Sequence, residues 1–339
     1  MTEGDAASRA ESGLRLGRRR HLVYTLDVSP SASPSQVAVR ASSLSRSFGD
    51  LVVVDGVDLT VGRGEAFSLL GPNGAGKTTT IRMLCCLLRP TGGAAEVMGH
   101  DVVSDPLSVK SVINISPQET AVAEHLNAWE NLSLIAGLHG IDRVKARSGE
   151  LLEMMGLTER ARDRVKKYSG GMKRRLSIAM ALISDPEVLF LDEPTLGLDP
   201  QSRRAIWEHV EALRGEKTVL LTTHYLEEAD ALADRIAVMD KGGIIALGTA
   251  DELKESVIGE PVMVVEAPDL DDGAFEALRR LYPETRRTEA GVEIEAREAS
   301  VYDIADVLRP RGIAVQSTHR KQVTLDDVFL HLTGERLRE

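Results

Sequence analysis

The sequence predicts an α/β protein built around a mostly parallel β-sheet, and three observations support that prediction. Short apolar segments typical of strands alternate with helical patterns through residues 36–250, as in sheets covered by helices on both faces. One of these segments runs directly into a glycine-rich loop that ends in Lys77-Thr78. Another ends in two adjacent carboxylates, Asp192 and Glu193, and open α/β sheets bind their ligands at such strand ends.

Strands and helices were assigned from hydrophobic periodicity. The predicted strands of the main region are 37–40, 51–61, 66–70, 113–116, 188–191 and 218–222. The predicted helical segments begin at Lys77 and continue with 127–183, 201–213 and 225–234.

Length and composition limit the class of protein. The chain has 339 residues, enough for about two average domains, and its 42% hydrophobic and 27% charged residues are ordinary globular usage. No uncharged stretch approaches the roughly 18 residues that span a bilayer, so we expect a soluble chain. A formal net charge of −11 argues against a protein that coats nucleic acid. Two adjacent cysteines predict neither a disulfide framework nor a structural zinc site, and they fit a reducing cytosol.

We predict three regions. Residues 1–35 contain a basic cluster without the apolar core of a signal peptide, which favours a disordered extension. Residues 36–250 form the main domain. Residues 251–339 form an accessory α+β domain with a β-α-β-β-α-β order, predicted from the segments 262–266, 272–281, a hairpin through Ala290-Gly291 to 292–296, 300–308 and 313–316.

A last helix is predicted from Thr324, with Asp327 three residues later as in a capping box. Its apolar residues form a single stripe, consisting of Leu325, Val328, Phe329 and Leu332. We expect this stripe to pack in the core of the accessory domain itself. We expect the domain to add no catalytic group and to act on dimer stability or on coupling.

The loop Gly71-Pro-Asn-Gly-Ala-Gly-Lys77-Thr78 matches G-x-x-x-x-G-K-[ST] between a strand and a helix. Its glycines let backbone N–H groups and a helix N-terminus converge on phosphate. Lys77 is expected to reach the β- and γ-phosphates, and the Thr78 hydroxyl to bind Mg²⁺. The glycine spacing and the closing lysine differ from the dinucleotide fingerprint, so the motif predicts a nucleoside triphosphate.

Further polar residues lie at predicted strand ends or at a helix start. Asp192 fits a magnesium ligand, and Glu193 is suited to polarise an attacking water. Ser169 is a good N-cap before two glycines, which indicates a second anion site, although a simply capped helix is the favoured interpretation of this segment taken alone. We interpret Lys173-Arg174-Arg175 as a solvated basic face. His224 and Gln118 follow short strands, and either alone is ambiguous.

Taken in order, these motifs resemble the nucleotide-binding domain of ATP-binding cassette (ABC) transporters over residues 37–253. The elements that carry the resemblance are Gly71–Thr79, Gln118, Ser169–Gly171, Val188–Pro194, Gly197-Leu-Asp199 and His224. They correspond to Walker A, Q-loop, signature, Walker B, D-loop and switch histidine. Tyr168-Ser-Gly-Gly-Met172 and the segment 324–334 resemble the daunorubicin-resistance subfamily of drug and lipid exporters.

The resemblance implies a P-loop cassette fold, with a mostly parallel core, an antiparallel β subdomain, an α-helical subdomain and a small C-terminal α+β domain. It implies ATP and Mg²⁺ as cofactors, Glu193, His224 and Lys77 as catalytic residues, and Thr78, Gln118 and Asp192 around the metal. The nucleotide contacts that it implies are Phe48, as the adenine-stacking aromatic, with Gly71, Pro72, Asn73, Gly74, Ala75, Gly76, Lys77, Thr78, Thr79, Gln118, Ser169, Gly170, Gly171 and Asp199.

The implied partners are a second nucleotide-binding domain in a head-to-tail dimer and a separate transmembrane permease, with no nucleic acid. The chain is then expected in the cytoplasm, at the inner face of the membrane through its permease. A drug or lipid exporter is the favoured function. Importer ATPases share the core motifs and remain an alternative. Cassettes that act on chromosomes or ribosomes are disfavoured, because Lys77 and Ser169 are separated by no coiled coil and the chain holds one cassette.

Overall fold

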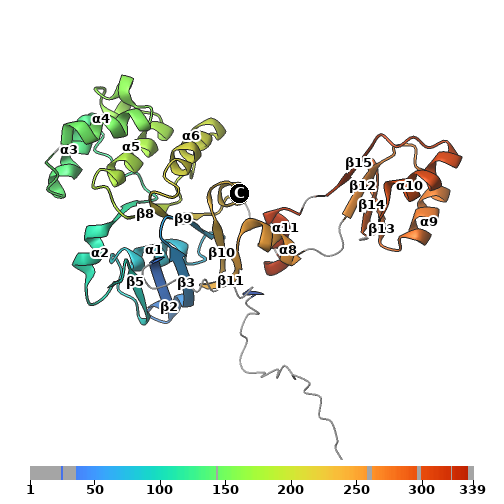
Figure 1. Ribbon diagram of the computed structural model, residues 1–339, viewed down its shortest axis with the longest axis horizontal. Helices are drawn as coiled ribbons and strands as arrows, with labels where there is room; N and C mark the ends of the chain where they lie inside the picture. The colour runs from blue at the N-terminus through green and yellow to red at the C-terminus, as the bar shows by residue number, and fades with distance from the viewer. Residues whose placement is uncertain are drawn as a thin grey trace, which may run out of the picture.

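The computed structural model describes residues 24–25, 36–142, 144–257, 262–295, 299–321 and 323–334. Figure 1 shows a large body that contains most of the chain, and a small body formed by residues 262–320 that stands apart from it. Within the described ranges, none of the helices combines the length and the apolar character that crossing a bilayer requires.

A seven-stranded sheet forms the centre of the large body. In spatial order its strands are β1 (Tyr24–Thr25), β11 (Gly243–Gly248), β10 (Arg235–Asp240), β4 (Ala66–Leu70), β9 (Thr218–Thr223), β8 (Val188–Asp192) and β7 (Ile113–Ser116). The five strands from β10 to β7 are parallel, whereas β11 is antiparallel to β10. Every residue of β4, β8 and β9 is buried, as expected for strands covered on both faces. β1 lies within the region predicted as a disordered extension and pairs with β11.

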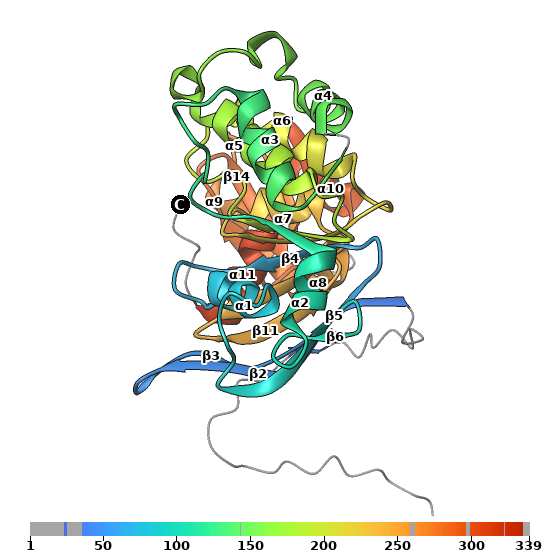
Figure 2. The same cartoon turned by 90° about the vertical axis from the view of Figure 1, so that its left-hand side faces the viewer.

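A four-stranded antiparallel sheet lies beside the central sheet (Figure 2). Its order is β3 (Leu51–Gly62), β2 (Val37–Phe48), β5 (Gly92–Val97) and β6 (His100–Asp101). β2 continues eight residues beyond the predicted strand 37–40 through several register shifts. The first helix, α1 (Lys77–Leu84), buries Ile81, Met83 and Leu84 in a core that contains residues of both sheets.

Six further helices of the large body lie between β6 and β10 in the described part of the chain. They are α2 (Pro106–Val112), α3 (Ala128–Leu138), α4 (Val144–Met154), α5 (Gly170–Leu182), α6 (Pro200–Glu211) and α7 (Leu226–Leu232). The segment predicted as helical over 127–183 is therefore three helices, with two short 3₁₀ turns between α4 and α5. α5 is buried on nearly all sides from Leu176 to Leu182, because α3 and α4 pack on it from one side and the sheet from the other.

The small body has the predicted β-α-β-β-α-β order. Its elements are β12 (Val262–Glu266), α9 (Asp272–Leu281), β13 (Thr285–Arg287), β14 (Gly291–Glu295), α10 (Val301–Leu308) and β15 (Ser317–Arg320). The sheet order is β13-β14-β12-β15, and every pairing is antiparallel. The last strand begins at Ser317 instead of residue 313, because a 3₁₀ turn and Gly312 follow α10 and Ile313 packs into the core.

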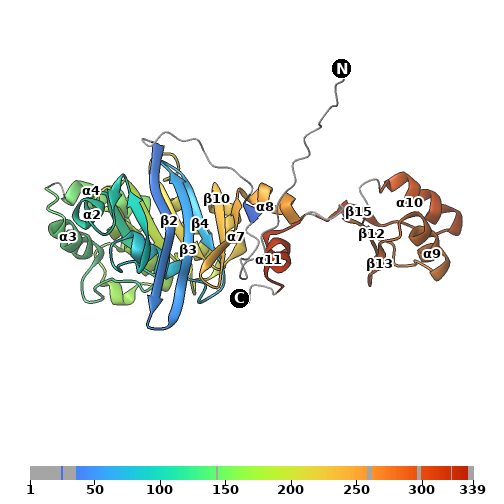
Figure 3. The ribbon, with the colours of Figure 1, turned by 90° about the horizontal axis from the view of Figure 1, so that it is seen from below.

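The last helix does not belong to the core of the small body, so that expectation is wrong. α11 (Leu325–Thr333) lies against α8 (Ala250–Val257) and α7, next to the large body (Figure 3). Its stripe of Leu325, Val328 and Phe329 is buried in a cluster with residues of β10, β11 and α8. The predicted capping box is present, since Thr324 and Asp327 exchange side-chain and backbone hydrogen bonds. The chain therefore leaves the large body after α8 and returns to it at α11.

Candidate active site

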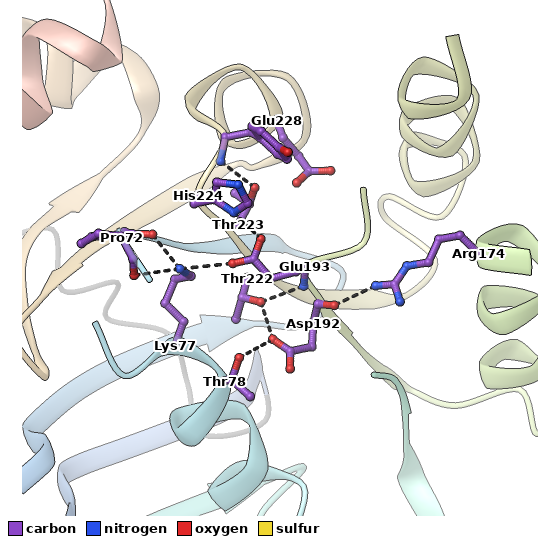
Figure 4. Close-up of polar contacts among 12 residues, drawn as sticks. Pro72, Lys77, Thr78, Arg174, Asp192, Glu193, Thr222, Thr223, His224 and Glu228 are labelled. Carbon is purple, nitrogen blue, oxygen red and sulfur yellow. Dashed lines mark hydrogen bonds and ion pairs between the residues drawn. The ribbon is translucent and has the colours of Figure 1, made fainter. Parts of the chain in front are cut away.

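The candidate site lies where β4, β8 and β9 end and α1 begins (Figure 4). The loop from Gly71 to Gly76 connects β4 to α1. At two of its positions the local geometry requires glycine. Gly76 has a φ of 100°, a left-handed conformation that favours glycine. A Cβ at Gly71 would lie 2.2 Å from the main-chain oxygen of Met239. A larger residue at either position would push the loop away from the sheet.

Lys77 is the first residue of α1, and its ammonium group is held inside the loop. Nζ donates to the carbonyl oxygens of Gly71, at 2.6 Å, and Pro72, at 3.1 Å. It also lies 3.2 Å from Oε1 of Glu193, and both side chains are 5% exposed. A buried cation needs such partners, because burial of an unpaired charge is costly.

Glu193 follows β8 in a left-handed backbone conformation, with a φ of 49°, which is uncommon for a residue other than glycine. Its N–H donates to Oγ1 of Thr222 at 2.9 Å, and this bond helps to hold the conformation. Its second carboxylate oxygen, Oε2, lies 2.7 Å from Nδ1 of His224. Glu193 thus joins Lys77 on one side to His224 on the other. Backbone strain of this kind is often found at functional sites.

Asp192, the last residue of β8, accepts two hydroxyl hydrogen bonds on Oδ1. Thr78 donates at 2.8 Å and Thr222 at 2.7 Å. The hydroxyl, the carboxylate and the amide oxygen of the nearby Gln118 are hard oxygen ligands of the kind that Mg²⁺ prefers. Among the described residues no cluster of three or more His, Cys, Asp or Glu side chains forms a metal site.

A cavity of about 280 Å³ opens at this point. It is lined by Val53, Asn73, Gly74, Ala75, Gly76, Lys77, Thr78, Thr79, Gln118 and Glu193. The structure therefore brings together the glycine-rich loop, the Q-loop glutamine and the carboxylate, as the sequence predicted.

Seven of the predicted nucleotide contacts do not line this cavity: Phe48, Gly71, Pro72, Ser169, Gly170, Gly171 and Asp199. Phe48 is 47% exposed. The guanidinium carbon of Arg46 lies over its ring, 4.4 Å from the ring centre. Ser169 caps α5 and Asp199 caps α6. The starts of these two helices lie close together: a Cβ added to Gly170 would lie 3.6 Å from Cδ2 of Leu198, which directly precedes Asp199. Ser169, Gly170 and Asp199 thus form part of a second surface.

Arg174 corrects the sequence prediction of a solvated basic face. Its side chain is only 4% exposed, and its guanidinium donates to main-chain carbonyls on two loops. Burial lowers the pKa of Arg174 to about 10, although the nearby carboxylates of Asp192, Glu228 and Glu193 oppose this shift. The hydrophobic periodicity of α5 did not indicate that Arg174 is buried, because periodicity assigns polar residues to a solvated face and the Arg174 side of this helix is covered by protein.

Thr222 and Glu228 were also missed. Thr222 bridges Asp192 and the Glu193 backbone. The sequence feature that could have indicated this residue is the pair of threonines at the end of an apolar strand. Glu228 lies one turn after His224 and accepts from Nε1 of Trp207 at 3.1 Å. Its burial raises its pKa, although the hydrogen bond from Trp207 opposes this shift. Its signal was a carboxylate four residues after the histidine, on the inner face of a short helix.

Comparisons with known proteins agree with this geometry. The family model described as "ABC transporter" matches residues 54–196. A daunorubicin resistance ATP-binding protein of Streptomyces coeruleorubidus is 46% identical over 309 residues, which cover 89% of this chain and 97% of that protein. A linearmycin resistance ATP-binding protein of Bacillus subtilis (strain 168) is 37% identical over 310 residues, with coverages of 89% and 100%.

Among solved structures, a dimeric ATP-binding cassette in a post-hydrolysis state with ADP and Pi superposes with a TM-score of 0.56. It is 26% identical and covers 62% of this chain and 98% of that one. The identity to resistance proteins extends over nearly the whole chain, and the solved cassette matches the body that holds the Lys77–Glu193–His224 site. The chain therefore belongs to the ABC transporter family, as an ATP-hydrolysing subunit of the daunorubicin-resistance subfamily.

Proposed function

We propose that two copies of this chain bind two ATP molecules head to tail. Each ATP contacts loop 71–79 of one copy and residues 169–171 of the other. None of residues 169–171 lines the cavity beside Lys77. The capped start of α5 instead presents its helix N–H groups on a different surface, and such helix starts attract anions. The solved relative that is dimeric with ADP and Pi supports this arrangement.

Within one copy, Lys77 and the backbone N–H groups of the loop bind the β- and γ-phosphates. Phe48 stacks on adenine, a role that its large exposed fraction permits. Asp199, at the start of α6, faces the second copy beside Ser169. The surface around loop 71–79 and the surface around residues 169–171 thus each form one half of a shared site.

Thr78, Gln118 and Asp192 are the residues that would hold Mg²⁺. The fit rests on the two hydroxyl hydrogen bonds at Asp192 Oδ1, which mark a small oxygen-lined position next to Thr78. When bound, Mg²⁺ supplies charge stabilisation to the phosphates during transfer.

Glu193 is the general base, and His224 and Lys77 assist it. The observation that supports this most directly is the pair of contacts on one carboxylate, to Lys77 at 3.2 Å and to His224 at 2.7 Å. Lys77 exchanges its contact with Glu193 for phosphate, and the released Oε1 can then accept a proton from water. His224 keeps Oε2 in place and orients the carboxylate.

The hydrolysis is coupled to export through a separate membrane permease, with the chain at the inner face of the membrane. The two sequence relatives described above are named for resistance to daunorubicin and linearmycin, which favours an amphipathic drug-like or lipid-like substrate. An importer or a non-transport cassette remains the alternative, and the resistance names weigh against both.

Coexpression with a candidate membrane permease from the same organism, followed by reconstitution into vesicles, tests the proposal. We expect ATP-dependent transport of an amphipathic dye such as doxorubicin, with ATP and the chain on the same side of the membrane. Transport in the opposite direction would support the importer. ATP hydrolysis unaffected by any membrane partner would support a non-transport role.

A further inference from the structure

Arg174 connects three segments of the chain through one guanidinium group. From the second turn of α5, Nε donates to the carbonyl oxygen of Pro194 at 2.8 Å, and Nη2 donates to that of Asp192 at 2.7 Å. Nη1 donates to the carbonyl oxygens of Pro117 and, at 3.3 Å, Gln118. Figure 4 shows the side chain extending from α5 to the end of β8.

These acceptors belong to the two loops that carry the site. Gln118, in the loop after β7, lines the cavity with Glu193, and the carbonyls of Asp192 and Pro194 flank Glu193 itself. A planar guanidinium offers donors in fixed directions to several carbonyls at once, whereas an ammonium group is a point donor. Arg174 therefore determines where these two loops lie relative to each other and to α5.

We propose that Arg174 is a positioning residue that aligns Gln118 and Glu193 within its own chain. The inference rests on the proposed shared site, because α5 would begin at the nucleotide of the opposite site. Arg174 thus lies on the helix that faces one ATP and supports the residues that act on the other. A defect at Arg174 should appear in the site that uses the same chain's Lys77.

Single variants give the first test. In Arg174→Lys and Arg174→Gln we expect kcat to fall by about tenfold or more, with the KM for ATP within about threefold of wild type and a higher Mg²⁺ concentration for half-maximal rate. Arg175→Gln is the matched control, since Arg175 lies next to it on α5 and donates to a single carbonyl, that of Met155, at 2.7 Å. We expect Arg175→Gln to lower the melting temperature without changing kcat or the Mg²⁺ requirement.

Heterodimers locate the effect. Chains with Lys77→Ala mixed with chains with Gly170→Asp keep one intact site, formed by Lys77 of the Gly170→Asp chain and Gly170 of the Lys77→Ala chain. We expect Arg174→Lys to abolish most of the remaining activity when added to the Gly170→Asp chain and to leave it largely intact when added to the Lys77→Ala chain. The less disruptive lysine substitution and a melting curve for each chain control for folding.

The outcomes separate the two claims. An inactive parent heterodimer would contradict the shared site of the proposed function. If the parent heterodimer is active, two results would overturn the positioning role. One is an equal loss of activity whichever chain carries Arg174→Lys, and the other is no loss in either case. Loss confined to the Lys77→Ala chain would also overturn it, because Arg174 would then act on the opposite site.

Discussion

The ammonium nitrogen of Lys77 lies 3.2 Å from Oε1 of Glu193. The cation proposed to bind phosphate and the proposed base therefore form a buried ion pair. Since His224 lies on the other carboxylate oxygen, Glu193 is held on both sides. In the proposed mechanism phosphate takes the place of Glu193 beside Lys77, and this links arrival of the substrate to release of the base.

Glu193→Gln should bind ATP and turn it over at least two to three orders of magnitude more slowly, the range for loss of a general base. The amide keeps the shape and loses the proton-accepting charge. ATPase assays with the membrane partner, together with ATP binding by fluorescence, measure both effects. Glu187→Gln is the control, because Glu187 is a half-exposed glutamate immediately before β8. Wild-type turnover in Glu193→Gln would exclude the base role.

Thr222→Val should reduce kcat by about tenfold with little change in the KM for ATP. The substitution keeps the volume of the side chain and removes the hydroxyl that joins Asp192 Oδ1 to the Glu193 N–H, so two buried groups lose a partner. Thr222→Ser should restore most of the rate. Equal rates for the Val and Ser variants would show that the hydroxyl has no such role.

Glu228→Gln should stabilise the protein at pH 8 and have little effect on stability near pH 5. The pKa of Glu228 is raised by burial, so the folded chain holds this proton more tightly than the unfolded chain does. Stability from this group is therefore complete below the unfolded value of 4.5 and is lost as pH rises through the folded value. A gain of a few degrees in melting temperature at pH 8 is expected.

Glu227→Gln is the matched control for this experiment, since Glu227 is the exposed neighbour on α7. A Glu228→Gln effect that is the same at both pH values would contradict the argument, because the difference must follow the titration.

Phe329→Ala should destabilise the cassette body by about 3–5 kcal/mol. Its ring is buried among residues of the large body, although the residue follows the small body in sequence. Leu308→Ala, in the separate core of the small body, should leave the unfolding of the cassette and ATP binding unchanged. Amide hydrogen exchange on β10 distinguishes the Phe329→Ala and Leu308→Ala variants. Unchanged protection of β10 in Phe329→Ala would show that α11 does not stabilise the cassette.

The packing of α11 against the large body also determines the expected effect of a C-terminal truncation. Removal of everything after residue 250 deletes α8 and α11 and uncovers Ile236 and Val238 of β10. A short flexible linker that replaces residues 258–323 keeps both helices and removes only the small body. We expect this variant, and not the simple truncation, to retain normal ATP binding while coupling to the permease is weakened.

The site was largely predictable from the sequence because its motifs are local. The loop before Lys77 and the carboxylates after β8 are contiguous, and strand ends of a parallel sheet lie at one edge. Arg174 and the α11 stripe were misassigned, because periodicity states that a face is buried or exposed and does not name its partner. β10 and β11 were missed as well, although β10 contains an apolar run, Ile236–Met239, of the same kind as the run that predicted β8.

The mixture of Lys77→Ala and Gly170→Asp chains tests the central claim, a site shared between two chains, most directly. Gly170→Asp is preferred to a change at Gly171, where a Cβ would lie 2.6 Å from Oγ of Ser202. Each variant alone should be inactive, and ATPase activity should appear on mixing and be highest at equal amounts. No activity at any ratio, with heterodimers demonstrated by differently tagged chains, would contradict the shared site.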